Sequence, residues 1–594
     1  MNTTETKVCT EQLGVLPIIA EYLNKINFTE NIDAIVEPLQ TNHRRFSHGK
    51  TCFVLILYLI TRPHVMYKVE EWVSNTSYLK LLFPDIQPEF FNDDRIADTL
   101  KALTKASIRN IFTMQSLNVI EAFNLPVDQV HCDFTSFSVH GSYEGFDDEE
   151  NITITYGYCK GNGLGKKQFM QEVAVTKDGG IPICTQTLDG NTADVTRYIP
   201  VWKELKANMG TSNFMIVGDC KLSSSDNLLQ IIKGSGYFLA PLAMNASVKE
   251  ELKEYVIEQQ VIPSPLYEKT THGVKQMYSG FEVPSSLTDM ETLKEYKYRR
   301  IYIHSPELEN LRIKSLHDHI NAACEDLSAL KDKANTKYYG SREKIYAKAE
   351  KILAKYDVKE FITYSITEHK ITREKKIGKG KPGPNSVYEK ITETILIFEY
   401  TVLDEYISAY YKYCGYFVLA TNKPVNQLSM LGALQAYKQE WKVEKIWERL
   451  KGPLQVLPIR LKLPKHIQAM MFLILTCAQV FTLIDREAKK TLAVNNEKLE
   501  GMFPNKIKTA SPKTEQIIDK FSNVSLVYMV QSEQVTVFAP ILNDLQLKLL
   551  KIIGVRSNYY DTGYIREQLE SSQAKVIIVS TILNTLTLNQ KVEK

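Results

Sequence analysis

The strongest constraint on the fold is a change in hydrophobic periodicity near residue 127. Before it, PIIAEYLNKINF and TCFVLILYLITRPHVMYKVEEWV repeat apolar residues at helical spacing, whereas VHCDFTSFSVHGSY alternates apolar and polar residues as a half-buried strand does. The segments ITITYGYCK, EVAVTK, IPICTQTL and NFMIVGDC continue as strands, and NLLQIIKGSG then has helical spacing. Strands followed by helices predict a mixed α/β domain behind a mostly helical N-terminal region.

The length of 594 residues is too great for one hydrophobic core, so several domains are expected. The N-terminal helices could form a DNA-binding or dimerisation module, or a plain packing domain. Changes of pattern predict five parts: an N-terminal helical domain (1–125), the first part of the α/β core (126–245), an inserted block of charged helices and short strands (246–405), the second part of the core (406–490) and a C-terminal region (491–594).

Composition indicates a chain that works in a reducing, aqueous compartment. The nine cysteines are scattered without a C-x-x-C pair, which argues against a structural zinc site or a disulfide framework. The N-terminus lacks the pattern of a signal peptide. The apolar segment 467–484 contains four polar residues and is expected to be a buried helix rather than a membrane span. We therefore expect a cytoplasmic protein without a membrane partner. A net charge of +3 requires any nucleic-acid affinity to come from local patches.

Three segments place carboxylates where chemistry is possible. Asp133 lies in the middle of a predicted strand, and Asp219 ends an apolar strand at the edge where sites of α/β sheets collect. Each could instead be a turn or capping residue. A long helix predicted from about Gln427 to Lys451 carries several charged residues on one face, which alone could be a solvated, salt-bridged surface. That face comprises Tyr437, Glu440, Glu444, Glu448 and Lys451.

These segments, taken together in order, resemble one branch of the DDE transposases of bacterial insertion sequences. YKQEWKVEKIWERLK resembles the branch's Tyr-x2-Arg-x3-Glu-x6-Lys signature, with Tyr437, Glu444 and Lys451 in register. HCDFTSFSVHG and IVGDCKLSSSDNL resemble its first- and second-aspartate strands, and LKLPKHIQAMMFLILTCAQVFTLI resembles the helix after the signature. The resemblance implies an α/β fold: a ribonuclease H-like mixed-sheet catalytic core with a large insertion domain and an N-terminal helical domain.

The resemblance also implies a reaction and its site. Asp133, Asp219 and Glu444 would be the catalytic residues and would hold two Mg²⁺ ions, for which Mn²⁺ can substitute. Two such ions activate a water or 3′-hydroxyl and stabilise the leaving oxygen. Tyr437 and Lys451 would contact DNA phosphate. The partners would be transposon terminal repeats and target DNA, bound by a homodimer associated with the nucleoid.

A basic segment inside the inserted block is a further candidate for DNA contact. REKKIGKGKPGPNS is rich in lysine, glycine and proline, which predicts an exposed loop. The loop could grip phosphates or be merely solvated. Its basic residues are Arg373, Lys375, Lys376, Lys379 and Lys381.

Two positions depart from the signature. Glu440 occupies the place of its arginine, and Glu448 stands where a basic residue is common. Both changes place negative charge on a face that would meet DNA. They leave open a second interpretation, a catalytically decayed or repurposed DNA-binding protein derived from a transposase.

Overall fold

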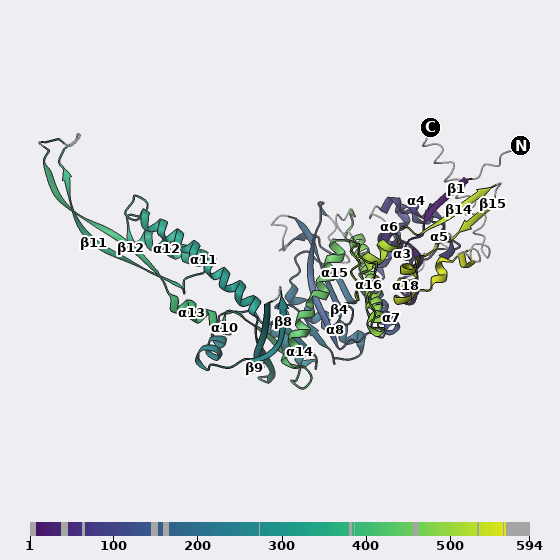
Figure 1. Cartoon of the computed structure of the whole chain (residues 1–594), viewed down its shortest axis with the longest axis horizontal. Helices are drawn as coiled ribbons and strands as arrows, with labels where there is room; N and C mark the ends of the chain where they lie inside the picture. The colour runs from purple at the N-terminus through teal and green to yellow at the C-terminus, as the bar shows by residue number, and fades with distance from the viewer. Residues whose placement is uncertain are drawn as a thin grey trace. The chain divides into compact units, whose positions relative to one another are not determined.

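The computed structural model of the chain consists of two compact units, Met1–Ala240 with Gln435–Lys594, and Pro241–Leu434 (Figure 1). It describes residues 7–36, 46–61, 66–143, 152–157, 166–271, 274–378, 383–384, 386–454, 461–531, 534–561 and 563–565.

The N-terminal region of the first unit is mostly helical, as the sequence predicts. Asn92 caps α6 by accepting a hydrogen bond from the Arg95 N–H at 3.0 Å. The helices are α1 (Leu16–Lys25), α2 (Phe28–Asp33), α3 (His48–Thr61), α4 (Val69–Ser74), α5 (Tyr78–Leu82), α6 (Asp93–Lys105) and α7 (Ile108–Phe123).

A small antiparallel sheet joins the N-terminal region to the C-terminal region. Strand β1 (Lys7–Gln12) pairs with β14 (Ser525–Gln531), which pairs in turn with β15 (Gln534–Phe538). Helix α18 (Asp544–Ile552) follows β15. The sequence does not predict β1, because its partner strand lies far along the chain and local periodicity cannot reveal so distant a pairing.

The main sheet of this unit has mixed strand directions. Its order is β4, β2, β6, β7, with β3 and β5 both paired to the outer edge of β4. Strands β4 and β2 are antiparallel, whereas β2, β6 and β7 run parallel. The bounds are β2 (Gln129–Ser138), β3 (Thr155–Tyr156), β4 (Lys167–Thr176), β5 (Pro182–Leu188), β6 (Met215–Val217) and β7 (Tyr237–Pro241), with helices α8 (Tyr198–Met209) and α9 (Ser225–Lys233) between strands.

Helix α16 (Pro464–Val494) is the central helix of the unit and packs against α3, α6, α7, α18 and β5. Among the described residues it alone is long and apolar enough to cross a membrane, and 94% of its most apolar stretch is buried here. Its buried Gln479 accepts from Gln115 Nε2 at 2.7 Å and donates to the Pro182 carbonyl at 2.6 Å. These bonds satisfy the amide inside the core. The expectation of a buried helix at 467–484 is confirmed.

The predicted long helix ending at Lys451 is broken. Helix α14 (Met430–Tyr437) gives way to a 3₁₀ turn (Lys438–Glu440), after which α15 (Trp441–Lys451) begins. A 3₁₀ turn has three residues per turn rather than 3.6. Residues at α-helical spacing on either side of it therefore do not share one face. The sequence has no proline or glycine at the break to predict it.

Buried ion pairs fix α15 to the rest of the unit. Arg449, only 2% exposed, binds Asp485 of α16 at 2.7 Å and Glu515 of α17 (Thr514–Lys520) at 2.9 Å. Lys445 also pairs with Asp485. Burial alone would raise the pKa of Asp485, but Arg449 and Lys445 outweigh it and hold that pKa below its usual range.

The second unit contains an antiparallel sheet and a long two-stranded ribbon. The sheet runs β13, β10, β9, β8, and the ribbon pairs β11 with β12 beside α11 and α12 (Figure 1). The bounds are β8 (Ser264–Thr271), β9 (Val274–Thr288), β10 (Glu295–His304), β11 (Ile362–Lys376), β12 (Tyr388–Val402), β13 (Tyr416–Thr421), α10 (Ala246–Lys253), α11 (Pro306–Lys333), α12 (Arg342–Tyr356) and α13 (Asp404–Tyr413).

The ion pairs of α15 predict that Asp485→Asn destabilises the protein. The change leaves two cations without their shared carboxylate, and breaking a buried pair costs about 3 kcal/mol. Urea denaturation at neutral pH measures it. Asp178→Asn is the control, because Asp178 pairs with Arg486 but is 41% exposed, and should cost less than about 1 kcal/mol. Equal losses in the two variants would contradict the proposed role of the buried pairs.

Candidate active site

Asp133 lies at the centre of β2, flanked by β4 on one side and β6 on the other. Its neighbours Cys132 and Phe134 are buried, as the alternating pattern predicts. The indole Nε1 of Trp447 donates a hydrogen bond to Asp133 Oδ2 at 2.8 Å. This bond links the strand to α15 and fixes one carboxylate oxygen.

Asp219 follows the parallel strand β6, which brings it to the same part of the sheet. The Tyr198 hydroxyl and the Lys221 N–H each donate to Asp219 Oδ1 at 2.8 Å. Tyr198 is fully buried, and its ring packs edge-on against Phe134 at 5.0 Å. Burial and the nearby anions raise the pKa of Tyr198, so its proton stays in place to hold Asp219.

Helix α15 covers the face of β2 that carries Asp133, Thr135 and Phe137. Lys451 Nζ donates to Thr135 Oγ1 at 3.1 Å and lies over the Phe137 ring at 5.6 Å. Because residues 133 and 135 share a strand face, Lys451 lies close to the position of Asp133. The sequence-predicted Asp133 and Lys451 therefore belong to one site.

Glu440, which the sequence did not assign as a metal ligand, interacts electrostatically with the three residues that it did assign. Burial and the negative charges of Asp133, Asp219 and Glu444 raise its pKa to about 7. Burial, Glu440 and Asp219 likewise raise the pKa of Tyr437 to about 12. Four carboxylates and a tyrosine thus lie within electrostatic range of one another. Glu444 itself is exposed, whereas Glu440 is partly buried.

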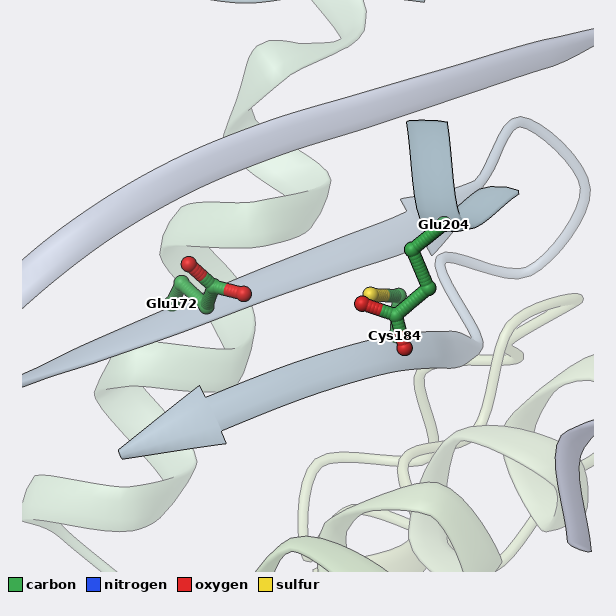
Figure 2. Close-up of side chains that lie close together, drawn as sticks. All are labelled: Glu172, Cys184 and Glu204. Carbon is green, nitrogen blue, oxygen red and sulfur yellow. The ribbon is translucent and has the colours of Figure 1, made fainter. Parts of the chain in front are cut away.

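No three of these four carboxylates, all within the described part of the chain, bring their oxygen atoms within 4.8 Å of one another. Among the described residues, the one group of three acidic, histidine or cysteine ligand atoms within 4.8 Å of one another is Glu172, Cys184 and Glu204 (Figure 2). Arg197 Nε binds Glu172 Oε2 at 2.9 Å, and Arg109 pairs with Glu204. Two guanidinium groups balance two carboxylates, so this cluster ties α7 and α8 to β4 and β5.

The basic segment of the second unit differs from its prediction. Arg373, Lys375 and Lys376 belong to β11, paired with β12, and are not part of a loop. Cross-strand pairing with β12 extends the strand to Lys376, before the first glycine at 378. Lys379 and Lys381 lie outside the described residues.

Comparisons with known proteins give limited matches. Residues 8–117 match a family described as a domain of unknown function, DUF4277. No protein with a curated description matches. A solved piggyBac transposase synaptic complex with hairpin DNA is 12% identical over 48% of this chain and 59% of that chain, with a TM-score of 0.24. The chain therefore aligns with about three fifths of that transposase chain, and a TM-score this low does not establish a shared fold.

The position of Glu440 predicts a dependence of stability on pH. Its folded-state pKa lies above the ordinary value of 4.5, so the folded protein holds this proton more tightly and loses stability as pH rises from about 4.5 to about 7. With a discount for partial exposure, the loss is about 1–2 kcal/mol. Glu440→Gln should remove it.

Urea denaturation across this pH range, with a chelator present, measures the effect. Glu448→Gln is the matched control, since it removes the same charge from an exposed position on α15. The same pH dependence in wild type and Glu440→Gln would show that the aspartates do not act on Glu440.

Proposed function

We propose that the chain is a DNA transposase that cleaves transposon ends and transfers the strands into target DNA. The observation that carries the proposal is the convergence of Asp133 on β2, Asp219 after the adjacent parallel strand and the acidic helix α15 packed on β2. The mixed sheet beneath them supports the ribonuclease H-like core expected from the sequence. The signature match of Tyr437, Glu444 and Lys451 supplies the reaction class.

The donor set fits divalent cations with a preference for oxygen. All three charges that act on Glu440 are carboxylates, so the site carries negative charge that Mg²⁺ or Mn²⁺ would offset. Asp133, Asp219 and Glu444 would hold the two ions. When bound, such ions supply activation of the attacking oxygen and stabilisation of the leaving oxygen. Trp447 and Tyr198 orient the two aspartates toward this task.

Positive charge for the DNA backbone would come from Lys451. Its ammonium group lies over the strand face that bears Asp133, so a phosphate against Lys451 would lie beside the first aspartate. Tyr437 would contact phosphate of the same DNA strand. The basic residues of β11, together with Lys379 and Lys381, are a second proposed phosphate contact.

The alternative is a DNA-binding protein that keeps this fold without transposition. The observation in its favour is Glu440, which replaces the signature's arginine and adds a fourth negative charge to the site. The two functions differ in one measurable respect, cleavage of DNA that carries the sequences flanking the gene.

The proposed site predicts which carboxylates are required for cleavage. Asp133→Ala, Asp219→Ala and Glu444→Ala should each abolish end cleavage while leaving folding and DNA binding nearly intact, because each removes a metal ligand. Glu440→Gln and Glu448→Gln should keep at least partial cleavage, whereas Glu444→Gln should be inactive. If Glu440→Gln is inactive and Glu444→Gln cuts, the third ligand is Glu440.

Cleavage should require Mg²⁺ or Mn²⁺, and Ca²⁺ should support DNA binding without cleavage. Nicking assays on the flanking DNA, run with each ion and with excess chelator, test this requirement. Full activity in chelator would remove the two-metal proposal. Binding without cleavage in every ion would establish the alternative function.

The hydroxyl of Tyr198 is predicted to position Asp219 for cleavage. Tyr198→Phe removes one charge-assisted hydrogen bond from a fully buried ring, so the cleavage rate should fall about tenfold and the Mg²⁺ concentration for half-maximal activity should rise. Tyr560→Phe is the control, because that buried hydroxyl bonds the distant Gly14 carbonyl. An unchanged Mg²⁺ dependence in Tyr198→Phe would reduce Tyr198 to a packing residue.

A further inference from the structure

A hollow of about 670 Å³ lies along the side of α15, within the first unit. Its walls are the turn after β4, helix α15, the C-terminal part of α16 and the residues just before α17. Glu444 lies on its wall, so the hollow borders the proposed metal site. We call it the basic groove, after its lysines Lys177, Lys442, Lys489, Lys490 and Lys513.

The basic groove has an excess of positive charge. Seven of its lining residues are basic and four are acidic. Two of the four acids are already paired, Asp178 with Arg486 and Asp485 with Lys445 and Arg449. In the described part of the chain, Lys442, Lys489, Lys490 and Lys513 have no carboxylate oxygen within 4.0 Å. Their charge is therefore available to a ligand.

Hydrogen bonds fix one lysine of the groove, Lys442. Lys442 is held in place by its bond to Gln439 Oε1 at 3.0 Å and by a bond to the Lys177 carbonyl. The ammonium group of Lys442 therefore has a fixed position at the wall of the groove.

The shape and composition of the groove favour an extended ligand. Its cations come from four separate parts of the chain: the turn after β4, helix α15, helix α16 and the residues before α17. Trp441 stands in the wall with 51% of its surface exposed, offering a flat face to a base or sugar. A chain of phosphates with attached bases satisfies both features.

We propose that the basic groove binds the phosphodiester backbone of DNA next to the bond that is cut. This inference rests on the proposed function. The DNA would run from Lys489 and Lys490 past Lys442 to Glu444, where the metal site begins. Glu448, also on the groove wall, opposes the backbone and weakens binding.

The test is the salt dependence of DNA binding with a chelator present, so that no cleavage occurs. The probe is a short duplex that carries the sequence flanking the gene. Lys489→Gln with Lys490→Gln should weaken binding and lower the log–log salt slope by up to about 1.8, because each lysine that no longer neutralises a phosphate lowers it by roughly 0.9. Glu448→Gln should tighten binding. Trp441→Phe should remove part of the fluorescence change that DNA produces.

The control is Lys548→Gln with Lys551→Gln on α18, which removes the same charge from exposed positions that do not line the groove. Thermal melting confirms that each variant is folded. Equal salt slopes for the two double variants would overturn the proposal that the basic groove binds DNA. Equally strong competition by an RNA duplex of the same sequence would also overturn it. Failure of the wild-type protein to bind the duplex would instead overturn the proposed function.

Discussion

The hydrogen bond from Trp447 to Asp133 joins two segments that are more than three hundred residues apart in the chain. It holds α15 against the central strand of the mixed sheet. The buried Arg449, paired with Asp485 and Glu515, holds the opposite side of the same helix against α16 and α17. Without both contacts the acidic helix would have no fixed position relative to the aspartates, and the carboxylates could not act as one site.

The cost of this arrangement is electrostatic. Burial and the neighbouring carboxylates oppose the charged form of Glu440 and raise its pKa to about 7. In the cluster of Glu172 and Glu204, elsewhere in the first unit, each carboxylate is paired with an arginine. Here the balancing charge is proposed to be a metal ion. Glu444 of the same helix belongs to the proposed metal site and also lines the basic groove.

The sequence predicted the secondary-structure elements of the site better than the contacts between them. Alternation around Asp133 and the apolar run before Asp219 are strong local signals, and both predicted strands are present. The 3₁₀ turn at Lys438–Glu440 is set by tertiary packing, and no helix-breaking residue reveals it. Tyr198 was missed because its role depends on a hydrogen bond to a residue on another element. The strand positions of Arg373 to Lys376 were missed because glycine and proline nearby suggested a loop.

The pairing of β1 with β14 has a consequence for how the protein is made. The first unit is built from two stretches of chain separated by the whole of the second unit. During synthesis β1 leaves the ribosome roughly five hundred residues before its partner strand, a wait of about 25–100 s at 5–20 residues per second. The second unit is continuous and can fold during that interval. The N-terminal helices meanwhile expose apolar surface that α16 and the C-terminal region later cover, which makes the nascent chain a natural client for chaperones.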